Sequence, residues 1–175
     1  SDALAEASLN EQAIFEAITR TAATNIGDSI IIRIASDDQK WLDTVAYYHI
    51  NPQASKIMRV VLGSYRQSAT DTVQGQVFQS GHSLFIPQVN QQAIRDQAPE
   101  VYHPYIDEIG ISSMMILPLR VRADIIGTIA MYRDAGGAPY TNDDLALVQN
   151  LADRGALALA NARLYLDQDG SPLGY

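Results

Sequence analysis

Apolar residues recur at helical intervals near both ends of this chain and in short β-branched runs between them. The helical spacing covers residues 8–22, with an earlier start near residue 3 also open, and residues 142–167. Runs rich in isoleucine, valine and leucine predict strands, because such side chains pack well on a pleated surface. The predicted strands are residues 29–35, 41–50, 83–86, 112–121 and 124–133.

Capping signals place two small helices between the second and third strands. Asn51 is suited to cap a helix whose first position is Pro52, and Gly63 is placed to end it. Residues 68–79 contain a second short helix, which Gly81 closes. We therefore expect a helix, a strand pair, two small helices and a single strand, in that order, before the middle of the chain.

The connection after the third strand, residues 88–110, is unusually long and rich in amide side chains. An ordinary connection has roughly 4–6 residues, and longer ones are commonly functional. Residues 100–109 have a helical pattern of their own, which Pro99 is placed to open and Pro104 to kink or keep short. We name residues 88–110 the lid and expect it to cover a site.

The strand pairs predict how the layers are stacked. Residues 29–35 and 41–50 are separated by a short polar break, and residues 112–121 and 124–133 by a tight turn, so each pair forms an antiparallel hairpin. The strands are apolar almost throughout, which indicates that both faces of the sheet are covered. We expect an α+β fold in which the terminal helices cover one face and the small helices and lid cover the other.

The length and hydrophobic content indicate a single domain. The chain has 175 residues, 47% of them hydrophobic, which is enough for one sizeable core. We assign residues 1–168 to the domain and residues 169–175 to a flexible tail or the start of a linker to an output domain. No apolar run is long enough to span a bilayer, and no basic-then-apolar signal segment begins the chain, so we expect a cytoplasmic location.

Charge and cysteine content narrow the partners and the chemistry. The formal net charge is −8, and an acidic surface repels both nucleic-acid phosphates and anionic membranes. We therefore expect neither a nucleic-acid nor a membrane partner. The chain has no cysteine, which excludes a disulfide, a thiolate nucleophile, a cysteine-bound metal and a thioether-linked cofactor.

Five segments, in order along the chain, resemble GAF domains, which are small-molecule-sensing modules of signalling proteins related to PAS domains. They are Gly-His-Ser-Leu-Phe-Ile-Pro at 81–87, Leu-Pro-Leu at 117–119, Ile-Gly-Thr-Ile-Ala at 126–130, Tyr-Thr-Asn-Asp-Asp-Leu at 140–145 and Ala-Asn-Ala-Arg-Leu-Tyr at 160–165. The resemblance implies a six-stranded antiparallel sheet with the N- and C-terminal helices on one face and small lid helices over the other. It also implies a ligand pocket between sheet and lid.

The same resemblance implies an assembly and a setting. GAF domains often dimerise through their terminal helices, so we expect a homodimer formed in this way. The parent would be a larger signalling protein, such as a sensor histidine kinase or a cyclic-dinucleotide enzyme. The terminal helices would then continue into the neighbouring output domain.

The candidate ligand contacts come from the third strand and the lid. A mostly apolar cavity with a few polar groups is typical of a small-molecule site, and we expect its contacts to be Phe85, Tyr102, His103, Tyr105 and Ile106. The alternative is that these side chains only pack the lid onto the sheet. The lid is also similar to the attachment segment of bilin-binding relatives, but Tyr102 stands where their cysteine would be. Covalent bilin attachment is therefore excluded.

Other cofactors find less support. The three histidines, His49, His82 and His103, do not have the spacing of a metal motif, so we expect no metal, and a haem ligand among them is the weaker alternative to ordinary core or surface roles. Cyclic-nucleotide-binding GAF domains carry a signature of which only Asp144 matches in type. An ion pair between Arg133 and Asp144 would join the last strand to the last helix as a structural contact.

No spacing of nucleophile, base and acid suggests catalysis. We therefore predict a non-catalytic regulatory domain that senses a small molecule and couples its binding to an adjacent output domain, such as a histidine kinase of a two-component system. The alternative is a ligand-free dimerisation or interaction module that only relays signals.

Overall fold

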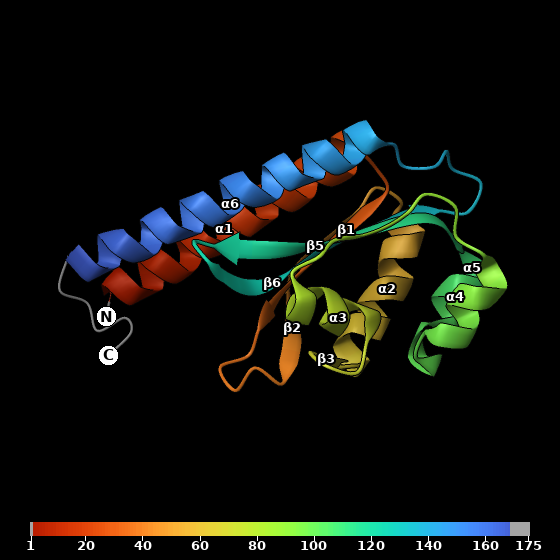
Figure 1. The fold of residues 1–175 in the computed structure, drawn as a ribbon, viewed down its shortest axis with the longest axis horizontal. Coiled ribbons are helices and arrows are strands. Elements are labelled where there is room, and N and C mark those ends of the chain that lie inside the picture. Colours follow the sequence, from red (N-terminus) through yellow and green to blue (C-terminus); the bar gives the residue numbers. More distant parts are fainter. Residues whose placement is uncertain (1, 169–175) are drawn as a thin grey trace.

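The computed structural model describes residues 2–168, which form three layers (Figure 1). Two long helices, α1 (Asp2–Asn25) and α6 (Asn142–Gln168), lie side by side as the first layer, and a single sheet is the second. The tail predicted at residues 169–175 lies outside the described residues. The third layer holds the small helices α2 (Pro52–Ser64), α3 (Val73–Ser80), α4 (Gln91–Gln97) and α5 (His103–Glu108), with the 3-10 turn η1 (Glu100–Tyr102).

The sheet has six antiparallel strands in the order β3-β2-β1-β6-β5-β4. The pairs β1–β2 and β5–β6 are the two predicted hairpins. The sequence pattern misses β3, which is only two residues long and pairs with Trp41 and Leu42 alone, so the rest of β2 has no outer partner strand. The strands are β1 (Ser29–Ala35), β2 (Trp41–His49), β3 (Gln67–Ser68), β4 (Leu84–Ile86), β5 (Ile111–Val121) and β6 (Asp124–Asp134).

The helix ends follow the signals in the sequence. The Asn51 side chain accepts hydrogen bonds from backbone N–H groups in the first turn of α2. Gly81 ends α3 with φ of 73°, a left-handed conformation that glycine adopts without steric cost. At the start of α6, Thr141 and Asp144 bond each other's backbone N–H groups at distances of 3.1 and 2.8 Å. This reciprocal arrangement is a capping box.

Both faces of the sheet are covered, as the apolar strands predict. In β1, the side chains of Ile30 and Ile32 are buried against the α1–α6 layer, and that of Ile31 is buried against the small helices. Successive residues of a strand point to opposite faces, so three consecutive isoleucines need a cover on each side. We call the face under α1 and α6 the helix-pair face, and the opposite one the lid face.

The first helix is longer than its capping signal indicates. It continues past residue 22 to Asn25, because Ala22 and Ala23 are buried in the core of the helix-pair face. Its partner α6 comes close at Gly155, where an added Cβ would clash with the Ile18 side chain. The absence of a side chain at Gly155 therefore lets the two helices pack closely.

The lid packs onto the sheet. Its predicted helical piece, residues 100–109, is divided into η1 and α5, and α4 precedes it without a prediction. Pro104 stands in the first turn of α5, where a missing N–H breaks no helical hydrogen bond, and α5 is short, with 6 residues. Tyr105 and Ile106 of α5 are only 1% and 7% exposed. These two side chains fix the lid to the lid face.

Candidate functional site

Two groups of polar side chains lie among the apolar residues of the lid face, and they differ in how completely they are hydrogen-bonded. The first, which we call the latch cluster, consists of His49, Tyr105 and Asp134. The second, the Arg33 cluster, consists of Arg33, Tyr65 and Tyr102. Each cluster joins the sheet to a covering segment, so each links the lid face to what lies above it.

In the latch cluster each polar group has a partner. The Nδ1 atom of His49 accepts from the backbone N–H of Asn51 at 2.9 Å, so Nε2 carries the proton and donates to Asp134 Oδ1 at 3.0 Å. The Tyr105 hydroxyl donates to the same oxygen at 2.9 Å and lies 3.1 Å from Nε2. The ends of β2, β6 and α5 are thereby tied together.

The latch cluster holds Tyr105 in its neutral form. Burial raises the pKa of its hydroxyl far above the ordinary value of 10.0, and the nearby negative charge of Asp134 raises it further. A neutral hydroxyl is a hydrogen-bond donor, which is the form that the Asp134 carboxylate requires. The cluster is therefore suited to holding the lid in place.

The Arg33 cluster is incompletely bonded. Arg33 projects from the middle of β1 onto the lid face and is 1% exposed. Its Nη2 atom donates to the Tyr102 hydroxyl at 3.1 Å, but Nε and Nη1 are buried and have no hydrogen-bond partner. Buried polar groups are nearly always bonded, so such an exception needs an explanation. A cation in this state is suited to binding something that is not part of the chain.

Aromatic and amide groups surround Arg33. The Tyr65 and Tyr102 rings make an edge-to-face contact with centroids 5.8 Å apart. Burial raises the pKa of the Tyr65 and Tyr132 hydroxyls, and the positive charge of Arg33 acts in the opposite direction on both. Beside them, Gln74 accepts from Thr128 Oγ1 and donates to the Tyr132 hydroxyl, each at 3.0 Å. Both ends of the Gln74 amide are thus hydrogen-bonded to side chains of β6, and neither is bonded to Arg33.

Arg33 forms part of the wall of a pocket, which we call the Arg33 pocket. The pocket has a volume of about 420 Å³ and enters between β2 and the C-terminal end of α2. Its size lies within the range of small-molecule sites, roughly 300–1,000 Å³. Its lining residues are Arg33, Leu42, Asp43, Thr44, Leu62, Gly63, Ser64, Tyr65, Arg66 and Gln67.

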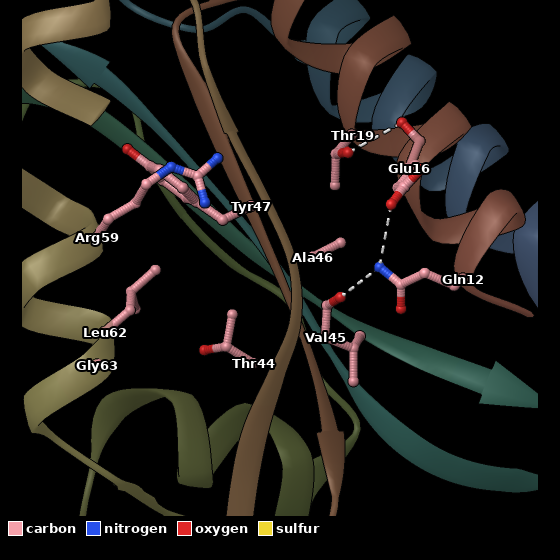
Figure 2. Close-up of a pocket in the computed structure, with 10 residues that line it drawn as sticks. All are labelled: Gln12, Glu16, Thr19, Thr44, Val45, Ala46, Tyr47, Arg59, Leu62 and Gly63. Atoms are coloured by element: carbon pink, nitrogen blue, oxygen red, sulfur yellow. Dashed lines mark hydrogen bonds between the residues drawn. The ribbon is translucent and has the colours of Figure 1, made fainter. Parts of the chain in front are cut away.

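A second depression of about 470 Å³, the outer groove, lies next to it. Figure 2 shows that its lining side chains come from α1, β2 and α2 and lie on both sides of β2, so the groove follows the edge of the sheet. Gln12 crosses this edge to donate to the Val45 carbonyl at 3.1 Å, and Arg59 lies over the Tyr47 ring. The groove is lined by Tyr47, whose buried hydroxyl has no hydrogen-bond partner but is neutral, whereas the Arg33 pocket has a charged group in this state, so we regard the Arg33 pocket as the candidate site.

The structure separates the five predicted contacts. Tyr102 belongs to the Arg33 cluster and Tyr105 to the latch cluster. Ile106 is part of the apolar core of the lid face, and the Nε2 atom of His103 donates to the Arg95 carbonyl at 2.9 Å inside the lid. Phe85 packs into the core of the helix-pair face. Phe85 is therefore on the wrong side of the sheet for a site under the lid, because in β4 its neighbours on either side face the lid.

The sequence reasoning misses Arg33, although the chain carries a signal for it. Arg33 is the only charged residue in the strand Ser-Ile-Ile-Ile-Arg-Ile-Ala, which is otherwise covered on both faces. A charge in such a strand is buried unless the strand is at an edge, and a buried charge needs a partner. The sequence of β1 therefore indicates Arg33 as a candidate site residue.

The predicted ion pair between Arg133 and Asp144 is absent from the described part of the chain. Arg133 instead donates from Nη2 to the Ile26 carbonyl at 2.9 Å and lies over the Tyr140 ring, with its guanidinium carbon 4.7 Å from the ring centroid. Asp144 is occupied by the cap of α6. The strand and the helix are joined through Tyr140, not through an ion pair.

Comparison with known proteins identifies the class. The family model of the GAF domain matches residues 10–159. The chain therefore belongs to the GAF domain family. The arrangement of a six-stranded antiparallel sheet between a pair of terminal helices and a lid is consistent with this assignment.

Solved structures with the same fold are distant in sequence. The second GAF domain of DevS from Mycobacterium smegmatis superimposes with a TM-score of 0.66 at 17% identity, over 90% of this chain and 99% of that one. The GAF domain/HD domain protein from Geobacter sulfurreducens gives 0.69 at 12% identity, over 88% and 94%. A methyl-accepting chemotaxis protein gives 0.65 at 15% identity, over 89% and 92%. At these identities the likeness establishes the fold alone.

Neither a membrane span nor a metal site is found within residues 2–168. None of the helices there has the length and hydropathy needed to cross a membrane. Nor do three or more histidine or acidic side chains within this range gather closely enough to hold a metal ion. The Arg33 pocket thus stands as the candidate site of the described chain.

Proposed function

We propose that this GAF domain is a sensory module that binds a small organic molecule in the Arg33 pocket and relays the binding to a neighbouring output domain. The observation that carries the proposal is a pocket of about 420 Å³ with a buried, incompletely bonded arginine in its wall. Family membership supports the regulatory role, and the module acts by binding, not by catalysis. A sensor histidine kinase is the output partner that we favour.

A route for the relay begins at Tyr102. This residue ends η1 in the lid, and its hydroxyl accepts a hydrogen bond from Arg33. A ligand that bonds to Arg33 changes the contacts available to Tyr102 and therefore favours one lid arrangement over another. The shift is limited to the difference in the ligand's affinity for the two arrangements. The helix pair receives the change through β1, because Ile30 and Ile32 of the same strand pack beneath α1 and α6.

We also propose that two copies associate through the helix pair. Three leucines there are well exposed: Leu9 of α1 is 71% exposed, and Leu147 and Leu157 of α6 are 55% and 63% exposed. Large exposed apolar side chains on two adjacent helices are suited to a symmetric interface. Light scattering tests this point, and a monomer at high micromolar concentration would contradict it.

The sensory proposal is tested on freshly purified chain. Native mass spectrometry should reveal a bound small molecule, or a panel of metabolites should contain compounds that raise the midpoint of thermal unfolding. The control variant is Arg59→Met, because it alters the outer groove without touching the Arg33 pocket. Phe78→Ala is unsuitable as a control, because the loss of its ring opens a cavity. No bound mass and no stabilising compound would instead favour a ligand-free interaction module.

A further inference from the structure

We propose that Arg33 binds the carboxylate of a small organic acid, which lies in the Arg33 pocket with its apolar part against Leu42, Leu62 and the Tyr65 ring. This inference rests on the proposed sensory function and specifies the chemical class of its ligand. It follows from three features of the site: a buried charge without a counter-ion, a single available cation, and an apolar part of the wall formed by Leu42, Leu62 and the Tyr65 ring.

The first feature is the cost of the buried charge. A guanidinium carries five N–H donors and cannot lose its proton in a protein. Removing such a group from water without a partner is strongly unfavourable, whereas an anion that bonds to it repays much of the cost. The Tyr102 hydroxyl accepts a hydrogen bond from Nη2 only, and Nε and Nη1 remain without an acceptor. An anionic group in the pocket would supply the acceptors that these nitrogens lack.

No carboxylate of the described chain is available for this purpose. Arg33 forms no ion pair within residues 2–168. Asp43 lines the same pocket, but both of its oxygens bond to Arg66, at 2.8 and 3.0 Å. This pairing lowers the pKa of Asp43, so it remains ionised and committed to Arg66. The acceptor for Arg33 must therefore come from outside the described chain.

The second feature, the single available cation, favours a carboxylate over a phosphate. A carboxylate carries one negative charge, which one guanidinium balances, and it accepts two parallel hydrogen bonds from an arginine. A phosphate monoester carries about 1.5 to 2 negative charges at pH 7. The pocket offers it no second free cation, because Arg66 is already paired, and Asp43 in the wall would repel it.

The third feature is the apolar part of the wall. Leu42 is 1% exposed and belongs to a small apolar core with Ala69 and Phe78. Leu62 and the ring of Tyr65 lie on the α2 side of the pocket. A site in which one unpaired charge lies near an apolar part of the wall suits a ligand with one charged end and a small apolar body. Benzoate has this form and is a suitable probe.

The experiment is calorimetric titration of the whole 175-residue chain with benzoate and with benzamide, its uncharged counterpart of nearly equal shape. We expect benzoate to bind more tightly than benzamide. Arg33→Met should weaken benzoate binding about 30-fold or more, because it removes one partner of a buried charge pair. Arg33→Lys keeps the charge but loses the planar guanidinium group. Its affinity for benzoate should lie between that of the unaltered chain and that of Arg33→Met. Arg59→Met removes a nearby exposed charge and should leave the affinity unchanged.

Folding of each variant is checked first, by urea unfolding followed by circular dichroism. If Arg33→Met does not fold, the comparison of benzoate with benzamide on the unaltered chain and the affinity of Arg33→Lys still test the proposal. Equal affinity for benzoate and benzamide would overturn it, and so would benzoate binding that Arg33→Met leaves intact. Binding of inorganic phosphate in preference to benzoate, dependent on Arg33, would overturn the carboxylate assignment.

The outcome is separable from that of the sensory proposal. A neutral metabolite that stabilises the chain, together with no binding of benzoate, acetate or 2-oxobutanoate, would overturn the role of Arg33 and leave the sensory function standing. If neither the metabolite panel nor these three acids bind, both proposals fail together.

Discussion

The latch cluster and the Arg33 cluster lie on the same face of the same sheet, and each joins the sheet to the lid. In the first, His49 and Tyr105 converge on one oxygen of Asp134. In the second, a buried guanidinium has a single partner, the Tyr102 hydroxyl. A complete set of hydrogen bonds holds a structure together, whereas an incomplete set leaves binding capacity for something else.

The difference shows how one covering segment can be both fixed and responsive. The lid is attached at α5 through the latch cluster and the buried side chains of Tyr105 and Ile106. At η1, only a few residues earlier, Val101 and Tyr102 are only partly buried against the lid-face core, and the Tyr102 hydroxyl accepts one hydrogen bond from Arg33. A ligand at Arg33 can therefore alter the η1 end of the lid while α5 keeps its place.

The largest effect should come from removing the shared acceptor of the latch cluster. Asp134→Ala removes the carboxylate that accepts from both the Nε2–H of His49 and the hydroxyl of Tyr105, and it leaves these two buried groups with only each other as partners. We expect a loss of about 3 kcal/mol in the free energy of unfolding, measured by urea denaturation at pH 8. The control is Asp96→Ala, an exposed carboxylate on α4, which should change the value by less than about 0.5 kcal/mol. Equal effects of the two substitutions would show that the latch cluster does not fix the lid.

Tyr105→Phe should have the next largest effect, about 1.5 kcal/mol at pH 8, because it removes one of the two donors to Asp134. The effect should depend on pH. The folded-state pKa of Tyr105 is raised above 10.0, so its contribution is complete below that pH and is lost as the pH rises further. The gap between the unaltered chain and Tyr105→Phe should narrow by about 1.4 kcal/mol at pH 11. A gap that is constant from pH 8 to pH 11 would contradict the raised pKa.

Tyr102→Phe should cost less, about 1 kcal/mol: it removes the acceptor of Arg33 Nη2, but the tyrosine is half-buried and its ring contact with Tyr65 remains. The measurement is the same urea denaturation, carried out beside Tyr105→Phe. The comparison of the two clusters predicts the smaller loss at Tyr102. The reverse order would mean that the Arg33 cluster, not the latch cluster, fixes the lid.

The smallest effect should come from the exposed ion pair between Arg95 of α4 and Asp107 of α5, whose side chains are 41% and 53% exposed. The hydrogen bonds from Arg95 hold the pKa of Asp107 below 3.8, so the contribution of the pair is present above that pH and disappears as the pH falls through the folded-state pKa. Asp107→Asn should have no resolvable effect on thermal unfolding in 0.5 M salt. A clear loss there would show that the lid depends on surface charge.

The fold could be predicted from the sequence to a large extent because its signals are local. Asn51, Gly81 and the pair Thr141 and Asp144 mark helix ends through contacts within one turn. The strand β3 could not be predicted, since two residues carry no periodicity and their pairing with Trp41 depends on the path of the chain. The helix α4 was missed because its polar, amide-rich sequence gives no apolar stripe.

The site could be predicted only in part, because it depends on contacts between distant segments. The resemblance to GAF domains pointed to the lid, and Tyr102 does lie in the Arg33 cluster. The sequence does not show which side chains of β4 face the lid, because this depends on the pairing of Phe85 with Met115 of β5. The prediction that Phe85 lies under the lid is wrong for this reason. Asp134, which bonds to His49, is 85 residues away along the chain, and Tyr102, which bonds to Arg33, is 69 residues away.

The most direct test of the central claim is the unfolding free energy of Arg33→Met without ligand. If the Arg33 cluster is reserved for a ligand, the substitution removes an unfavourable buried charge. The stability should then be equal to that of the unaltered chain, or higher by up to about 2 kcal/mol. A loss of about 2 kcal/mol or more, comparable to that of Asp134→Ala, would show that Arg33 serves the fold and would contradict the account.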